Sequence, residues 1–403
     1  MKDKRIIPVS SGKGGVGKTT FALNYALALS AYGPTVLIDL DMGTSSIRHA
    51  LDTPIAHDLY HFFRQDRPLA DCITTLPARL DPLQRFREFG FIAAPKNFID
   101  DITNFKRPRR DKLIDAINAL DVAYVVLDMK AGLDSNVIGF LPFSNSGILV
   151  FTPYLEAATV AASDIVKAIL FRKLRTIFAP GSSLYQVVLG VTPAEVGALI
   201  DQAEDSYDAR LSNLDAFADA LHERLGNHPV VKLVANTIHF FRVHYVLNMF
   251  NGVKESYDTA VKPFVQNLFA NVSSQLNIVN LGWVIDHEDI RRANRRRVPI
   301  LLGKDAAQLG VSDRLGKLAT EFLAPRARAS VRQRLDPTRL LEAELAVMMR
   351  MQEDLASASY EDNFKYIVAR SLHVMSSKRL SDLGDNQIFK RFEFERVLAQ
   401  RGR

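Results

Sequence analysis

The sequence predicts an α/β protein whose mostly parallel, twisted sheet is flanked by helices, with a helical appendage at the carboxyl end. Short apolar, β-branched runs alternate with longer helical stretches over most of the chain, as expected for strand–helix–strand units. Several of these runs are apolar at nearly every position, which is typical of strands buried on both faces. A glycine-rich loop joins the first run to the first helical stretch.

The predicted strands follow one another at intervals along the chain. They lie at residues 5–9, 35–40, 89–94, 123–128, 147–152, 231–236 and 278–284. The segment between the fifth and sixth runs is much longer than the roughly 10 to 12 residues that a crossover between parallel strands needs. We therefore expect a helical insertion at about residues 180–229. Within it, Thr192 and Glu195 flank Pro193 in a capping-box pattern that predicts a helix start.

Composition changes at Pro325, so we divide the chain into residues 1–325 and a helical appendage, residues 326–403. After an arginine-rich stretch, Asp336 and Pro337 open a helix. Apolar residues recur at helical spacing in the next two stretches, namely Leu341, Leu345, Met348 and Leu355, then Phe364, Ile367, Val368, Leu372 and Met375. Such stripes must be buried against the rest of the chain, a second copy or a separate partner, and we expect a protein partner or cargo to bind through the appendage.

Composition excludes several classes of protein. The chain has 403 residues, of which 47% are hydrophobic and 24% charged, as in soluble globular proteins with a large core. The single cysteine, Cys72, excludes an internal disulfide and any site built from several thiolates of one chain. No apolar stretch approaches the ~18 residues of a membrane span, so we expect a cytoplasmic protein. A net charge of +6 is too small to argue for nucleic acid or anionic lipid.

A phosphate-binding loop directly follows the first predicted strand. Residues 12–19 fit the pattern GxxxxGK followed by Ser or Thr, and a helical stretch comes next. The glycines let backbone N–H groups point at phosphate oxygens, Lys18 reaches the β- and γ-phosphates, and the Thr19 hydroxyl can bind Mg²⁺. We therefore expect a P-loop NTPase fold with a nucleotide site formed by Gly12, Gly14, Gly15, Val16, Gly17, Lys18, Thr19 and Thr20.

Two apolar strands end in carboxylates near this loop. The strand that ends at residue 128 delivers Asp128, and an aspartate in that place holds Mg²⁺ through water in this kind of fold. Asp39 and Asp41 lie two positions apart at the end of another strand and therefore point to the same side. The sequence thus predicts a metal site that involves Thr19 and Asp128.

The string KGGVGKTT contains a second lysine, Lys13, five positions before Lys18. With this string, most of residues 1–324 resembles the MinD/ParA group of dimerising ATPases, which have a deviant Walker A loop. The resemblance implies ATP as the nucleotide and an ATP-sandwich homodimer in which Lys13 reaches the partner's nucleotide. It also implies that Asp41 orients the attacking water and that Asp39 supports the magnesium shell. Lys13, Lys18 and Asp41 would then be the catalytic residues.

The resemblance implies a base site as well. Asn236, at the end of the sixth predicted strand, matches the asparagine that contacts the adenine edge in relatives, and Ile285 and Asp286 match the loop beside the base. Gly132 suits a switch segment whose backbone meets the γ-phosphate. Lys130 departs from the proline or glycine that relatives usually have, and it either alters the hydrolysis rate or projects to solvent.

The expected function is a slow, partner-stimulated ATPase that acts as a positioning switch for cell division, flagella or another cargo. One alternative is a ParA-type partition ATPase that binds nucleoid DNA, for which the basic clusters 106–112 and 291–297 are candidates. Another is a small-molecule ATP-dependent ligase of the same superfamily. Lys13, the insertion and the appendage favour the switch, and a location peripheral to membrane or nucleoid would accompany it.

Overall fold

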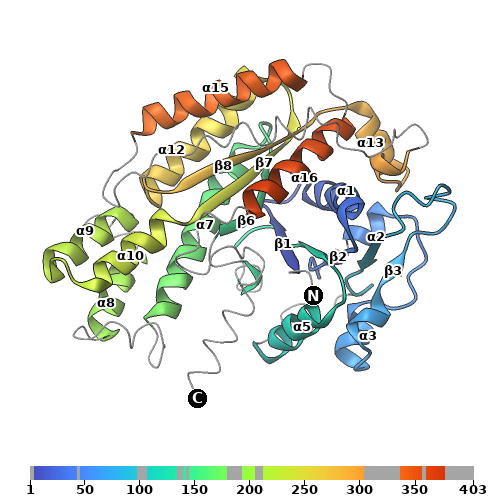
Figure 1. The fold of residues 1–403 in the computed structure, drawn as a ribbon, viewed down its shortest axis with the longest axis horizontal. Helices are drawn as coiled ribbons and strands as arrows, with labels where there is room; N and C mark the ends of the chain where they lie inside the picture. The colour runs from blue at the N-terminus through green and yellow to red at the C-terminus, as the bar shows by residue number, and fades with distance from the viewer. Residues whose placement is uncertain are drawn as a thin grey trace.

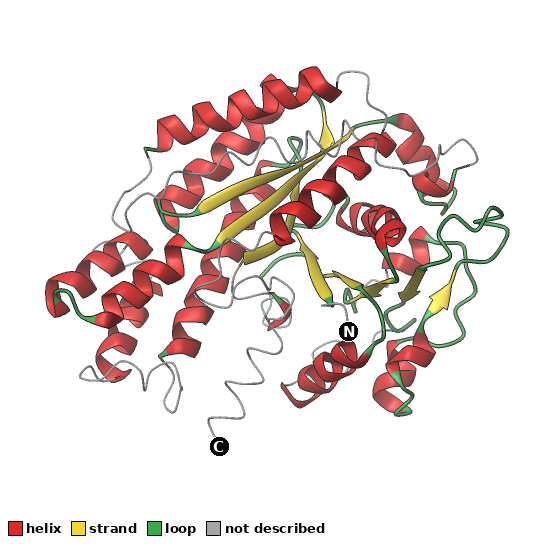
Figure 2. Ribbon diagram, in the orientation of Figure 1, coloured by secondary structure: helices red, strands yellow, loops and turns green. Residues whose placement is uncertain are grey.

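The computed structural model describes residues 4–42, 46–97, 107–133, 139–141, 145–178, 193–204, 212–303, 336–355 and 360–376. Within these residues an eight-stranded sheet is flanked by helices on both faces (Figures 1 and 2). The strand order is β3-β4-β2-β5-β1-β6-β7-β8, and every neighbouring pair is parallel except β3 with β4. The predicted α/β fold with a mostly parallel sheet is confirmed.

The elements have the following bounds. The strands are β1 (Arg5–Ser10), β2 (Thr35–Asp39), β3 (Thr74–Thr75), β4 (Phe89–Ile92), β5 (Tyr124–Asp128), β6 (Asn145–Phe151), β7 (Arg242–Phe250) and β8 (Asn277–Ile285). The helices are α1 (Lys18–Leu29), α2 (Ser46–Ala50), α3 (Leu59–Arg64), α5 (Arg107–Ala119), α7 (Glu156–Ile177), α8 (Pro193–Glu204), α9 (Leu214–Leu225), α10 (Pro229–His239), α11 (Val253–Ser256), α12 (Lys262–Asn271), α13 (Glu288–Arg295), α15 (Pro337–Leu355) and α16 (Tyr360–Ser376). A π-helical segment, Tyr257–Val261, joins α11 to α12, and short 3-10 turns lie at Ser30–Tyr32, Leu69–Cys72 and Ile300–Leu302.

The strand predicted at residues 231–236 is wrong, because these residues lie in helix α10. The His228 side chain accepts a hydrogen bond from the backbone N–H of Val230 at 3.3 Å and caps the helix, with proline at its first position. Val230, Val234 and Ile238 recur every four residues and are fully buried, so the apolar run is one face of a helix. The strand that completes this part of the sheet is β7, which lies between β6 and β8.

Helices α8, α9 and α10 form the insertion between β6 and β7, and Figure 1 shows them gathered beside one end of the long helix α7. Helix α8 begins at Pro193, where the sequence predicts a helix start, while Thr192 lies outside the described residues. The buried carboxylate of Asp215, on α9, accepts hydrogen bonds from the hydroxyls of Ser273 and Ser274 at 2.6 and 2.7 Å. These bonds fasten the insertion to the turn before β8.

Helices α15 and α16 pack on the body of the sheet. Helix α16 lies against α1 and β8 (Figure 1), and the ring of Phe364 stacks on that of Phe21 at 6.0 Å. The hydroxyls of Tyr25 and Ser371 are 2.7 Å apart in a buried hydrogen bond. Helix α15 packs against α11 and α12, and Tyr257 donates a hydrogen bond to the Leu341 carbonyl at 3.1 Å. The two carboxyl-terminal helices therefore share the core of the domain that contains the sheet.

Helix α16 also covers the outer edge of β8, the terminal strand of the sheet. The Asn363 side-chain oxygen accepts a hydrogen bond from the Ile285 N–H at 3.1 Å. The Arg370 guanidinium donates to the Asn280 carbonyl at 2.5 Å. Side chains of α16 therefore satisfy backbone groups that an uncovered edge strand would offer to another chain.

Candidate nucleotide site

The phosphate loop connects β1, near the middle of the sheet, to the first turn of α1. Its glycines are required where the chain turns and where neighbours approach closely. Gly17 has a φ of +78°, and a Cβ there would lie 2.2 Å from the Asn248 side-chain nitrogen. A Cβ on Gly12 would lie 2.5 Å from the Ala161 carbonyl carbon on α7. The loop is therefore held by β7 on one side and α7 on the other.

The loop lysine reaches the aspartate of the neighbouring strand. Lys18, 7% exposed, forms an ion pair with the fully buried Asp128 at the end of β5. The pairing follows from the sheet, because β5 lies beside β1 with Val9 opposite Asp128. Of the two carboxylate oxygens, Oδ2 is buried and has no hydrogen-bond partner among the described residues. Asp128 therefore offers one free oxygen beside the loop that carries Lys18 and Thr19.

Asp39 ends β2, the strand on the other side of β5, and Asp41 follows two residues later. Asp39 lies opposite Asp128 and is fully buried, whereas Asp41 is half-buried. The Asp39 carboxylate accepts backbone hydrogen bonds from Asp41 at 3.0 Å and from Ile47 at 3.1 Å. Burial and the nearby charge of Asp128 raise the pKa of Asp39 to about 8. Asp39 thus organises the chain after β2 and leaves Asp41 as the more accessible carboxylate.

Residues 129–132 run alongside the beginning of the phosphate loop. The Met129 N–H donates to the Val9 carbonyl at 3.0 Å, and the Gly132 N–H donates to the Ser11 carbonyl at 2.8 Å. Met129 is buried, while Lys130 is exposed. The predicted switch residue Gly132 therefore lies next to the loop.

The structure corrects the prediction for Asn236. This residue lies on α10, which leads into the amino end of β7, whereas the phosphate loop lies at the carboxyl end of β1. Because β6 runs parallel to both strands, these two ends are opposite edges of the sheet. The asparagine beside the loop is Asn248, which sequence reasoning missed and whose side-chain N–H donates to the Val16 carbonyl at 2.8 Å. The polar Asn248 within the apolar run of β7 is the signal that could have found it.

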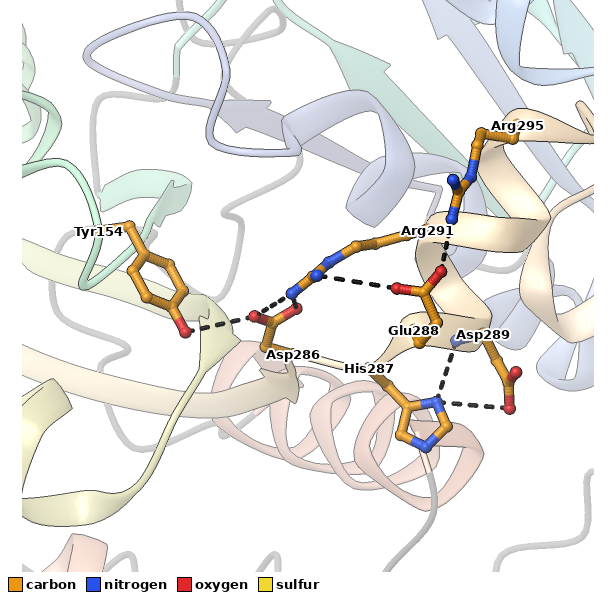
Figure 3. Close-up of polar contacts among 7 residues, drawn as sticks. All are labelled: Tyr154, Asp286, His287, Glu288, Asp289, Arg291 and Arg295. Atoms are coloured by element: carbon orange, nitrogen blue, oxygen red, sulfur yellow. Dashed lines mark hydrogen bonds and ion pairs between the residues drawn. The ribbon is translucent and has the colours of Figure 1, made fainter.

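Asp286, predicted to lie beside the base, follows β8 at the same edge. Its carboxylate accepts hydrogen bonds from Arg291 at 2.6 and 2.5 Å and from the Tyr154 hydroxyl at 3.2 Å (Figure 3). The backbone N–H of Asp286 donates to the Phe250 carbonyl at 3.0 Å, and Ile285 is half-buried. Partial burial and the charge of Asp286 raise the pKa of the Tyr154 phenol. This cluster therefore joins the chain after β6 to that after β8.

Lys13 is exposed at the outer side of the phosphate loop. Large apolar side chains are also exposed after β5, after β6 and on the first turns of α7, namely Leu133, Tyr154, Leu155 and Val160. The described residues contain no group of three or more His, Cys, Asp or Glu side chains placed to hold a metal ion. None of the helices described is both long and apolar enough to span a bilayer.

The part of the chain that contains the phosphate loop matches a known protein family. Residues 2–61 match the family model described as ParA, NUBPL iron-transfer P-loop NTPase, and this range includes the loop, Asp39 and Asp41. Septum site-determining protein MinD of Escherichia coli (strain K12) is 29% identical over 174 residues, which are 42% of this chain and 60% of MinD. MinD of Helicobacter pylori is 27% identical over 173 residues, or 42% of this chain and 59% of that protein. The predicted resemblance to MinD/ParA ATPases is confirmed.

Two solved structures also match a large part of this chain. MinD from Pyrococcus horikoshii, complexed with Mg-ADP, is 14% identical with a TM-score of 0.44 and covers 76% of this chain and 91% of that one. A ParA family ATPase from Chlorobium tepidum is 16% identical with a TM-score of 0.42, covering 76% and 95%. The chain matches about 60% of the length of the curated MinD relatives named above.

Proposed function

We propose that this chain is an ATPase of the MinD/ParA kind, which binds Mg·ATP, closes as an ATP-sandwich homodimer and acts as a positioning switch. The observation that carries the proposal is the phosphate loop, with buried Lys18 against Asp128 and exposed Lys13 outside. Backbone N–H groups of the loop and the first turn of α1 suit phosphate oxygens, and Lys18 supplies the point charge for the β- and γ-phosphates.

The residues fit a magnesium ion. Asp128 offers a buried oxygen that has no hydrogen-bond partner among the described residues, and hard oxygen ligands are those that Mg²⁺ prefers. Thr19 would hold the ion directly and Asp128 through water, with Asp39 supporting that arrangement. When bound, Mg²⁺ would neutralise charge on the β- and γ-phosphates.

Hydrolysis is assigned to Asp41. Asp39 is fully buried and accepts two backbone hydrogen bonds, so its carboxylate is committed to local structure. Asp41 is half-buried at the same strand end and can orient a water toward the γ-phosphate. We therefore infer that hydrolysis depends on the carboxylate of Asp41.

Dimerisation is assigned to the edge of the sheet that carries the loop. Lys13 is exposed there, and Leu133, Tyr154, Leu155 and Val160 expose apolar surface after β5 and β6. Exposed apolar side chains near an exposed lysine suit a second copy that brings its own nucleotide phosphates. ATP would then close the dimer and hydrolysis would release it, which is the basis of a switch that holds and releases a cargo.

The test separates the two lysines. Lys18→Ala should abolish ATP binding in calorimetry, because the phosphates lose their main cation. Lys13→Ala should leave ATP binding measurable and prevent the ATP-dependent increase in mass seen by light scattering. Lys232→Ala, an exposed lysine on α10 away from the loop, is the matched control. If both loop variants still dimerised with ATP, the sandwich dimer would have to be abandoned.

The ion pairs of the basic cluster 291–297 argue against the DNA-binding alternative. Arg291, Arg292 and Arg295 all contact acidic groups of their own segment. Figure 3 shows two of these contacts, Arg291 with Asp286 and Arg295 with Glu288. Local carboxylates therefore offset much of this positive charge before any phosphate approaches.

A further inference from the structure

Lys130 lies just after β5, the strand that ends at Asp128 in the candidate nucleotide site. It follows Asp128 by two positions, and Asp128 contacts Lys18 of the phosphate loop. The hydrogen bonds from Met129 to Val9 and from Gly132 to Ser11 hold the chain on both sides of Lys130. Its backbone is therefore tied to the carboxyl end of β1, where the phosphate loop begins, while its side chain is exposed.

Lys18 and Asp128 indicate where the γ-phosphate would lie in the proposed site. In the proposed site Lys18 would serve the β- and γ-phosphates, and because Lys18 contacts Asp128, the end of β5 would lie beside the terminal phosphate. Consecutive Cα atoms are about 3.8 Å apart, so Lys130 begins within roughly 8 Å of Asp128 along the chain. A lysine carries its ammonium group on a flexible four-carbon stem, so the ammonium group of Lys130 can swing toward the end of β5.

The charge balance of the site favours another cation. Two charged carboxylates, those of Asp41 and Asp128, lie at these strand ends beside the buried Asp39, and Lys18 is already paired with Asp128. The terminal phosphate of ATP adds further negative charge at this end, and like charges close together are costly in a partly buried site. A second ammonium group would offset the part of that cost that the γ-phosphate adds.

We propose that Lys130 binds the γ-phosphate and makes the chain discriminate ATP from ADP. This inference rests on the nucleotide binding proposed above and adds a residue to that site. The ammonium group donates to oxygens that ADP lacks, so it contributes to triphosphate affinity and leaves diphosphate affinity unchanged. A charge-assisted contact of this kind corresponds to a change of about 10-fold or more in affinity.

The experiment measures two dissociation constants for the full chain, those of Mg·ADP and of Mg·AMPPNP, a triphosphate that is not hydrolysed. Variants are Lys130→Gln, Lys130→Arg and the control Lys232→Gln on α10. Measurements are repeated in a Lys13→Ala background, so that dimerisation does not contribute to the triphosphate affinity. Thermal melting of each variant checks the fold, which should be unchanged because Lys130 is exposed.

We expect Lys130→Gln to raise the dissociation constant of Mg·AMPPNP about 10-fold or more. The dissociation constant of Mg·ADP should stay within about twofold of the wild-type value. Lys130→Arg should retain most of the preference, and Lys232→Gln should match wild type. Equal weakening of both nucleotides, or no weakening, would overturn the role of Lys130 while leaving the ATPase proposal standing. A wild-type chain that binds neither nucleotide would overturn both.

Discussion

Removing the carboxyl-terminal helices should prevent the rest of the chain from folding as a soluble protein. A chain that ends at residue 325 lacks α15 and α16, and with them a set of buried apolar side chains: Leu340, Leu341, Met348, Met351, Phe364, Tyr366, Ile367, Val368 and Val374. Their counterparts on α1 and β8 would become exposed.

Phe364 alone shows how large the loss of stability would be. Phe364 is 1% exposed and stacks on Phe21, so Phe364→Ala should cost about 3 to 5 kcal/mol of unfolding free energy. Whole domains are stable by only about 5 to 15 kcal/mol, so the loss of the full set exceeds what the remaining fold can tolerate. The uncovered edge of β8 adds a route to aggregation, because Asn363 and Arg370 no longer cover it.

The assay compares full-length and truncated chains for soluble yield, cooperative thermal unfolding by circular dichroism, and ATP binding. Phe364→Ala and Met349→Ala are measured in the full chain by denaturant unfolding. Met349 is 54% exposed on α15, so its variant should stay within about 0.5 kcal/mol of wild type. A truncated chain that is soluble, unfolds cooperatively and binds ATP would refute the reasoning and restore the view of residues 326–403 as a separate module.

Three further predictions concern single residues. Asp41→Ala should keep Mg·ATP bound and stall phosphate release, so that the variant accumulates as an ATP-loaded dimer; phosphate release at the wild-type rate would move the role to another group. Gly17→Ala should lower stability by at least about 1 to 2 kcal/mol, because the residue is left-handed and its Cβ would meet Asn248, whereas Gly14→Ala, with open space around it, should melt like wild type. Burial and two nearby arginines lower the pKa of His244 to about 3, so this neutral imidazole stabilises the fold above pH 6.5 and its contribution is lost as pH falls toward 3. Relative to His244→Gln, wild type should therefore lose about 1.4 kcal/mol per pH unit below 6.5 in denaturant titrations, and a difference that does not vary with pH would contradict this.

The phosphate loop and the aspartates beside it could be located from the sequence because the patterns that mark them are local. The residues from Gly12 to Thr19 are contiguous, and the strand before them and the helix after them are both present in the structure. Asp39 and Asp128 end apolar runs, and parallel strands bring such ends to one edge of the sheet. The loop is recognised from contiguous residues alone. The aspartates are recognised from the rule that parallel strands end at the same side of a sheet.

Tertiary structure decided which apolar runs became strands and what lies against the loop. Residues 231–236 are as apolar as a strand, yet they lie in helix α10, whose buried residues Val230, Val234 and Ile238 are spaced four apart and which packs against α9. Asn248 contacts the loop because β7 lies near β1 in the sheet, with only β6 between them. The stripes of α15 and α16 showed that these helices must be buried, but the surface that buries them, including Phe21 of α1 and the edge of β8, is assembled from distant segments. Such contacts depend on the register and packing of the whole sheet, which no local pattern specifies.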